Sequence, residues 1–280
     1  MDGAARFTED LRELAAESFA LAGQMCGDCK TFHMLWPYHR LAQAAGGDVG
    51  IPLVRSTLQN LLRQGGRKIL IGGSADSGLL AVVARAASSG TDITVLDRCA
   101  TPLELCRRFA DRWSLPITTL NLDLRDLSAH SSFDVVFIHM LLQFIPAGQH
   151  LDTLVRVRRS LHPGGRMVLV LRTNTCGEDG PSVDGWRDHA THLIEHLRAG
   201  KIPLPEPGEQ FHSRLQIYFE ERRRRQNTYS DPAQAEALLT ASGFDIETLV
   251  PIVSPMAAEF VPLKSGLLRF LAVAKARDAI

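Results

Sequence analysis

The sequence lacks an excess of either charge, a long apolar run and any regular spacing of its few cysteines. Its 280 residues carry 31 basic and 31 acidic side chains, a balance that disfavours a general nucleic-acid or membrane-surface binder. No run is long and apolar enough to cross a bilayer, and the polar start MDGAARFTED does not resemble a secretory signal. Five cysteines without regular spacing favour reduced thiols and a cytoplasmic location.

Aromatic residues are scarce as well, at 6% of the chain, but 45% of all residues are hydrophobic. This length and composition support a full core, in one elaborated domain or two small ones. The apolar spacing predicts helices up to about Arg63, the second of them over Thr31–Ala45. From Arg67 onwards strand and helix patterns alternate, which predicts a parallel sheet with right-handed crossovers. An irregular stretch over residues 172–230 includes a predicted helix near Gly185–Ala199.

Two further helix starts are marked by capping residues and prolines. Thr101-Pro102-Leu103-Glu104 predicts a helix capped by Thr101, with a first-turn proline and a glutamate three residues after the cap. Asp231-Pro232 predicts the start of the last helix in the same way. The arginine run over residues 222–225 is typical of a solvated helix face.

The most informative segment is Lys68–Leu80, with the sequence KILIGGSADSGLL. An apolar strand runs into a loop of small residues that opens a helix, and a second apolar run, Ile93–Leu96, ends at Asp97. Such a unit offers backbone N–H groups to a nucleotide-like ligand and an acid to its ribose hydroxyls. The loop lacks the middle glycine of the usual fingerprint, so an ordinary strand-to-helix turn is the alternative.

Three later segments extend this pattern. The segment that starts at Leu161, LHPGGRMVLV, predicts a helix end, a Pro-Gly-Gly turn and a strand. The segment that starts at Phe133, FDVVFIH, predicts an apolar strand. The segment that starts at Ala237, ALLTASGFDI, predicts a helix that ends at a glycine before a strand. In this order the segments resemble the class I S-adenosylmethionine (SAM)-dependent methyltransferases of small-molecule type, over roughly residues 66–277. The resemblance implies an α/β, Rossmann-like, doubly wound and mostly parallel seven-stranded sheet with a helical N-terminal lid. We therefore expect a lid over residues 1–65 and a SAM-binding domain over residues 66–280, with an insertion at about 172–230.

The resemblance also implies a set of cofactor-binding positions. The first strand of the family commonly ends in an acid that reaches the methionyl amine, but Ile71 stands there, so Asp76 or a lid residue is the expected substitute. Asp97 is expected at the ribose hydroxyls, and Asp123, with Asp126 as its rival, near the adenine amino group. The full set of expected cofactor-binding residues is Gly72, Gly73, Ser74, Ala75, Asp97, Arg98, Asp123, Leu124 and His139.

The segment Cys26–Arg40 is chemically dense, with two cysteines, two histidines and several aromatic residues. Its residue types allow a zinc site or a redox pair. His33 follows Cys29 by only four residues, a spacing shorter than the loop of a zinc finger, so we expect no metal. The preferred interpretation is a lid that closes over a small-molecule acceptor. The expected catalytic residues are His33, Tyr38, His39 and His139.

The resemblance implies an enzyme that moves a methyl group from SAM to an oxygen, nitrogen or carbon nucleophile of a small molecule. A SAM-binding protein of the same fold that transfers no methyl group, either cyclase-like or a sensor, is the alternative. A nicotinamide-dependent short-chain reductase is disfavoured, because no tyrosine is followed four residues later by the required lysine. The expected partner is a small-molecule acceptor, with no nucleic acid and no membrane, and a homodimer is left open.

Overall fold

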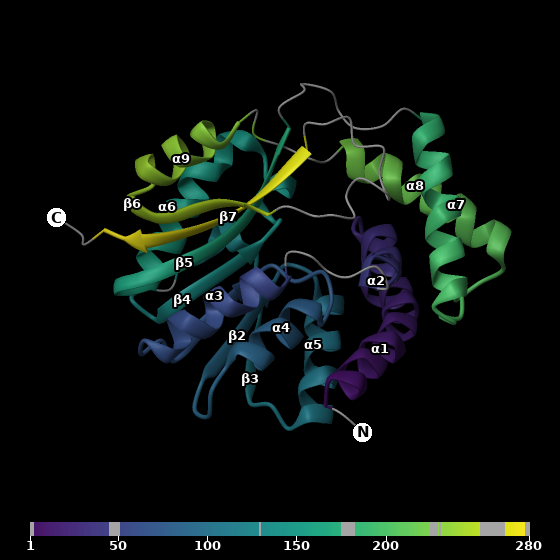
Figure 1. Cartoon of the computed structure of the whole chain (residues 1–280), viewed down its shortest axis with the longest axis horizontal. Coiled ribbons are helices and arrows are strands. Elements are labelled where there is room, and N and C mark those ends of the chain that lie inside the picture. Colours follow the sequence, from purple (N-terminus) through teal and green to yellow (C-terminus); the bar gives the residue numbers. More distant parts are fainter. Residues whose placement is uncertain are drawn as a thin grey trace.

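The computed structural model describes residues 3–44, 51–128, 130–174, 183–224, 229, 231–252 and 267–277. Helices occupy the chain up to Arg63, as expected, and strands begin at Lys68 (Figure 1). The helices are α1 (Gly3–Met25), α2 (Lys30–Ala44), α3 (Ile51–Arg63), α4 (Gly78–Ala86), α5 (Ala100–Trp113), α6 (His150–Ser160), α7 (Val183–Ala199), α8 (Gly208–Arg224) and α9 (Pro232–Ala241). The strands are β1 (Lys68–Gly72), β2 (Asp92–Asp97), β3 (Ile117–Asn121), β4 (Phe133–His139), β5 (Leu161–Asn174), β6 (Phe244–Ile252) and β7 (Leu267–Ala276).

The strands form one seven-stranded sheet in the order β3-β2-β1-β4-β5-β7-β6. The pairs from β3 to β5 are parallel, whereas β7 runs antiparallel to both β5 and β6. The strand order reverses between β1 and β4, and a ligand crevice in a doubly wound sheet lies at the carboxyl ends of such strands. The predicted fold class is confirmed.

The alternation of side chains along each strand divides the core into two layers. Ile69, Ile71 and Phe137 point to the face that α3, α4 and α5 cover, while Leu70 and Val136 point to the face that α6 and α9 cover. All five side chains are fully buried, as expected for the strands of a parallel sheet covered on both faces. This packing places the carboxyl ends of β1, β2 and β4 side by side.

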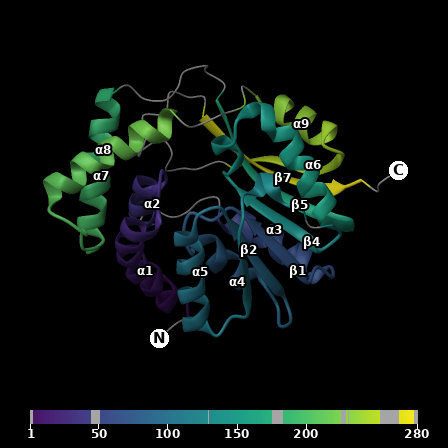
Figure 2. The same cartoon turned by 180° about the vertical axis from the view of Figure 1, so that it is seen from behind.

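Four helices form a separate layer, which we call the helical cap: α1, α2, α7 and α8. They lie together at the right of Figure 1 and at the left of Figure 2, which shows the opposite side. Their shared core contains Leu35 and Tyr38 of α2, Leu193 of α7, and Phe211 and Phe219 of α8. The first two helices of the chain thus pack with the two helices of the insertion. By contrast, α3 buries its apolar side in the core of the sheet.

Two local predictions differ from the structure. Helix α5 begins at Ala100 with Cys99 at its N-cap, and Thr101 is buried inside the first turn instead of capping it. The Pro163-Gly164-Gly165 segment is an irregularity within β5, since Phe133 pairs with Leu161 but Val135 already pairs with Arg166. Gly164 has a φ of +74°, which favours glycine.

The remaining predicted elements agree with the structure or lie partly outside it. Asp231 caps α9, because its carboxylate accepts a hydrogen bond from the Gln234 N–H at 2.9 Å. Helix α8 ends at Arg224, and the side chains of the arginine run lie outside the described residues. Among the described helices, none combines the length and apolar character that a membrane span requires.

Candidate functional site

A cavity of about 700 Å³ lies between the carboxyl ends of the strands and the helical cap. This volume is in the range of pockets that hold cofactors and small molecules. Its sheet side is formed by the loops after β1, β2, β3 and β4, and its cap side by α2 and α8, with further side chains from α1, α3 and α4. The cavity therefore lies where the reversal of strand order predicts a ligand site.

The loop after β1 is held tightly by its own backbone. Gly73 has a φ of +81°, and its N–H donates to the Leu96 carbonyl of β2 at 2.8 Å. A Cβ at Gly73 would lie 2.7 Å from the Leu141 Cδ2, so a side chain there would require Leu141 to move. The Ser74 hydroxyl donates to the Asp76 carbonyl at 2.6 Å. Small residues are required here because neighbouring groups approach the loop backbone closely.

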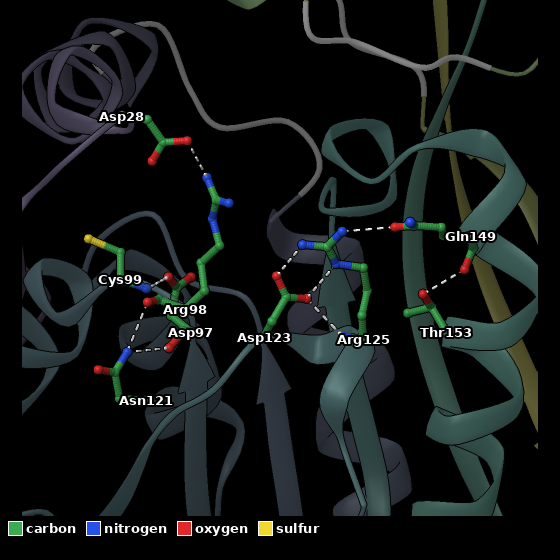
Figure 3. A network of polar contacts seen from close by, with 9 residues as sticks. All are labelled: Asp28, Asp97, Arg98, Cys99, Asn121, Asp123, Arg125, Gln149 and Thr153. Carbon is green, nitrogen blue, oxygen red and sulfur yellow. Dashed lines mark hydrogen bonds and ion pairs between the residues drawn. The ribbon is translucent and has the colours of Figure 1, made fainter.

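Asp97 ends β2 and joins the loops after β1 and β2. Its carboxylate accepts the Ser74 N–H at 2.9 Å and the Cys99 N–H at 2.7 Å. Burial raises the pKa of Asp97 above its usual value, although these two hydrogen bonds act in the opposite direction. Asn121 donates to the carbonyls of Asp97 and Arg98, which fixes the end of β2 against β3 (Figure 3). Asp97 is therefore a well-fixed acceptor in the cavity wall.

Asp123, after β3, is engaged by a neighbouring cation. It caps the short 3-10 helix Leu124–Asp126 and forms an ion pair with Arg125 at 2.7 Å. Hydrogen bonds from the guanidinium lower the pKa of Asp123. Arg125 also donates to Gln149 at 2.8 Å, so the pair is anchored at the start of α6 (Figure 3). Asp123 and Arg125 both line the cavity.

A buried ion pair connects the cap to the loop after β1. Arg40 of α2 donates to Asp76 at 2.7 Å, and the same carboxylate accepts the Gly78 N–H at 2.6 Å. The side chains are 15% and 5% exposed, so neither partner can lose the other without leaving a poorly solvated charge. Ile71 lies wholly in the sheet core. Asp76 is the carboxylate nearest in sequence to Ile71, the position where an acid is expected in the resembled family. Its carboxylate is already paired with Arg40.

The other half of the cavity is aromatic. Phe32 stacks on Trp36, with ring centroids 5.8 Å apart, and contacts Phe144 at 5.5 Å and Tyr218 at 6.0 Å. His139, at the end of β4, also lines this space. Burial lowers the pKa of His139 to about 3, so the ring is neutral near pH 7.

Comparison with known proteins agrees with this geometry. Residues 72–165 match the family model described as a methyltransferase domain. This segment of the chain is therefore similar to a methyltransferase domain. An 88-residue segment is 32% identical to the carboxy-S-adenosyl-L-methionine synthase of Pseudomonas putida (strain GB-1), over 29% of this chain and 35% of that protein. The chain therefore matches about a third of the length of its curated relatives.

Solved structures show the same fold over most of the chain. A Burkholderia thailandensis 1,6-didemethyltoxoflavin-N1-methyltransferase, with its substrate and S-adenosylhomocysteine bound, has a TM-score of 0.54 at 17% identity. The similarity covers 87% of this chain and 85% of that one. A geranyl diphosphate methyltransferase has a TM-score of 0.53 at 13% identity, over 80% of this chain and 77% of that one. The predicted resemblance is confirmed at the level of the fold.

The fold brings most of the predicted site residues to one cavity. His33 lines it, and so do eight of the nine expected cofactor-binding residues. These eight are Gly73, Ser74, Ala75, Asp97, Arg98, Asp123, Leu124 and His139. Gly72 does not line the cavity. It lies within β1, where a Cβ would meet the Ile138 side chain at 3.2 Å.

Two predicted catalytic residues lie elsewhere, which corrects the expectation that they face an acceptor. Tyr38 is 1% exposed and packs against Phe19 and Phe211 inside the cap. His39 is buried against Trp36 and Phe219, and neither residue lines the cavity. The sequence predicts that both residues belong to the second helix, but it does not show which side of that helix faces the cavity. Tertiary packing decides this.

Several lining residues escaped sequence reasoning because they come from distant segments. Phe144 follows β4, Tyr218 and Glu221 belong to α8, and Arg269 belongs to β7. Cys99 was missed as well: it lies beside Cys26, Cys29 and His33. The cysteine spacing within the N-terminal segment gives no signal for a ligand more than seventy residues away.

Proposed function

We propose that this protein is a SAM-dependent methyltransferase that transfers a methyl group to an oxygen, nitrogen or carbon atom of a small molecule. One observation carries the proposal: the close-packed Gly73–Ala75 loop is hydrogen-bonded to Asp97 at the switch point of a methyltransferase sheet. The backbone of a loop in this position can bind a nucleoside ligand, and the ribose of that ligand then reaches the acid at the end of the second strand. The similarities to solved methyltransferases support the same cofactor.

The residues on the sheet side fit the parts of SAM. The Gly73–Ala75 backbone suits the methionyl part, Asp97 the ribose hydroxyls, and Asp123 with Leu124 the adenine end. Asp97 keeps acceptor capacity beyond its two backbone hydrogen bonds, because a carboxylate has about four lone-pair sites. When bound, SAM supplies an electrophilic methyl group on its sulfonium.

The cap supplies the acceptor side of the proposed site. Phe32, Trp36, Phe144 and Tyr218 form an aromatic surface that suits an apolar or planar acceptor. Holding the acceptor against this surface would supply the proximity that an in-line displacement needs. Of the histidines in the described part of the chain, His139 and His33 line the cavity, and neutral His139 can orient an acceptor by a hydrogen bond. We propose α1 and α2, together with the insertion helices α7 and α8, as the lid over the cofactor domain at 66–280. The lid expected at residues 1–65 is too long, because α3 packs in the core of the sheet.

Isothermal titration calorimetry with S-adenosylhomocysteine tests the cofactor assignment. We expect the wild type to bind S-adenosylhomocysteine but neither NAD nor NADP. Asp97→Asn should weaken binding by roughly 10- to 100-fold, since an unpaired buried polar group costs about 1–3 kcal/mol. Asp92→Asn, at the exposed opposite end of β2, is the matched control and should bind like the wild type. Tight nicotinamide binding without a response to S-adenosylhomocysteine would refute the proposal.

A second candidate is a SAM-binding protein of this fold that transfers no methyl group. This candidate is favoured because Ile71, near the end of β1, replaces the acid that the resembled family commonly has there. The local similarity to a carboxy-S-adenosyl-L-methionine synthase favours it as well. Mass spectrometry of reactions with methyl-labelled SAM separates the two. A methylated acceptor formed with one equivalent of S-adenosylhomocysteine supports the methyltransferase, and turnover of SAM without methylation supports the alternative.

The remaining parts of the proposal concern partners and location. The even balance of acidic and basic residues supports a small-molecule acceptor over nucleic acid or a membrane. A cytoplasmic location and a homodimer stay predictions. Light scattering of the purified protein would measure the assembly state.

A further inference from the structure

We propose that Cys26, Cys29, His33 and Cys99 bind one zinc ion, which fixes the helical cap to the edge of the sheet. Each residue offers one ligand atom, and these four atoms all lie within 4.8 Å of one another. The proposal is independent of the methyltransferase assignment. It replaces the expectation of no metal, which considered ligands from the N-terminal segment alone.

The distances suit a metal better than a disulfide. In a tetrahedral site with Zn–S bonds of about 2.3 Å, two sulfur atoms lie roughly 3.8 Å apart. The Sγ atoms of Cys26 and Cys99 are 3.4 Å apart, whereas a disulfide bond measures about 2.05 Å. The cluster therefore needs only small side-chain adjustments to surround an ion.

The fold brings the four ligands from two distant places in the chain. Cys26 and Cys29 occupy the turn between α1 and α2, and His33 follows one helical turn into α2, where its N–H donates to the Cys29 carbonyl. Cys99 is the N-cap of α5, directly after β2. A Cys-x-x-Cys pair on a turn, with a histidine one turn later, leaves a fourth position that the sheet edge fills.

The surroundings orient the proposed ligands. The His33 Nδ1 lies 3.1 Å from the Ala75 carbonyl, which can only accept, so Nδ1 carries the proton and Nε2 keeps its lone pair for a metal. Carbonyl acceptors of this kind commonly fix metal-bound histidines. The Thr101 hydroxyl lies 3.0 Å from the Cys26 sulfur and can donate to a thiolate. His33 and Cys99 are 5% and 7% exposed, so these two ligands are shielded from bulk solvent.

The ligand set indicates both the metal and its role. Three thiolates and one imidazole are a typical set for tetrahedral zinc, and four protein ligands leave no position for a substrate. The role is therefore structural. His33 holds the loop at Ala75, and the Cys99 N–H holds Asp97, so the ion would lock the α1–α2 turn against the wall of the cavity.

Elemental analysis of the full-length protein, purified under reducing conditions without a metal-affinity tag, tests the proposal. We expect about one zinc ion per chain, bound by four ligands. Cys29→Ser and Cys99→Ser should lose most of this zinc. Cys106→Ser is the matched control, because that thiol is buried outside the cluster, 3.9 Å from the Ser74 hydroxyl, and it should keep the full content.

Cobalt substitution keeps the test valid if the serine variants fold poorly. After chelation and addition of Co²⁺, wild type and Cys106→Ser should show the intense visible absorption of tetrahedral thiolate-bound cobalt, and His33→Ala should lose or shift it. A protein that binds neither zinc nor cobalt stoichiometrically while its thiols are reduced would overturn the proposal. A disulfide between Cys26 and Cys99, found by peptide mapping under the same conditions, would also overturn it.

Discussion

Gly73 shows how one residue can shape the floor of the cavity. Its backbone is in the left-handed region, and Leu141 occupies the space that a side chain would need. Gly90 has nearly the same φ, at +85°, but a Cβ there would meet nothing within 4 Å. The pair separates the cost of backbone strain from the cost of a steric clash.

We expect Gly73→Ala to lower the free energy of unfolding more than Gly90→Ala does. Backbone strain costs each variant about 1 kcal/mol, and overpacking against Leu141 adds roughly 1–3 kcal/mol to Gly73→Ala alone. Gly73→Ala should also weaken S-adenosylhomocysteine binding, because the loop must move. Urea denaturation and calorimetry measure both effects. Equal stability of the two variants would mean that Leu141 moves aside freely.

At the scale of single elements, helix starts differ in how they satisfy their first N–H groups. Asp231 caps α9 through its carboxylate, the arrangement that the sequence predicts. At α4 the N-cap is Ser77, whose side chain makes no capping hydrogen bond. Within the described part of the chain, the buried Ser77 hydroxyl has no hydrogen-bond partner. A residue type that favours the N-cap position therefore forms the capping hydrogen bond at α9 but not at α4.

Replacing the two N-cap side chains should have different consequences. Asp231→Ala is expected to lower the free energy of unfolding by about 1 kcal/mol, the usual value of an N-cap hydrogen bond. Ser77→Ala should be neutral or slightly stabilising, because it removes a buried hydroxyl without a partner. Chemical denaturation of both variants beside the wild type checks this. A large loss of stability in Ser77→Ala would reveal a hydrogen bond that forms in solution.

At the scale of the whole molecule, the cap is joined to the sheet by charge as well as by apolar packing. Glu17 of α1 pairs with Arg108 of α5 at 2.8 Å and with Arg112 at 2.6 Å. Arg40 and Asp76 add a buried pair beside the cavity. The cavity wall therefore contains residues of both the sheet and the cap, and His139 is enclosed only when the two layers are packed together.

This enclosure predicts how stability depends on pH. The pKa of His139 falls from 6.5 to about 3 on folding, chiefly because burial disfavours the charged ring. Below pH 6.5 the unfolded chain binds a proton that the folded chain does not, so His139 lowers stability as the pH falls toward 3. The slope is about 1.4 kcal/mol per pH unit for one proton.

His139→Gln should remove this contribution to the slope, whatever its effect on stability at pH 7. Urea denaturation of the wild type and the variant between pH 4 and 7 gives the difference. Parallel stability curves would show that His139 titrates normally in the folded protein.

The sequence by itself determined the elements and the fold class of this protein. The apolar runs around Ile69, Ile93 and Val135 are typical of strands buried on both faces of a parallel sheet. The order of strands and helices predicted a doubly wound fold, which solved methyltransferases share. The positions of Asp97 and the glycine loop followed from the same order, since strand ends converge on one edge of the sheet.

Only the tertiary structure decided which distant side chains meet. The period of α2 shows that one side is buried, but it does not show that Tyr38 faces the cap core while Trp36 faces the cavity. It also gives no sign that Arg40 reaches Asp76 or that Cys99 joins Cys26, Cys29 and His33. Local pattern encodes burial and backbone geometry, whereas these contacts depend on how the cap docks on the sheet, which is a property of the whole chain.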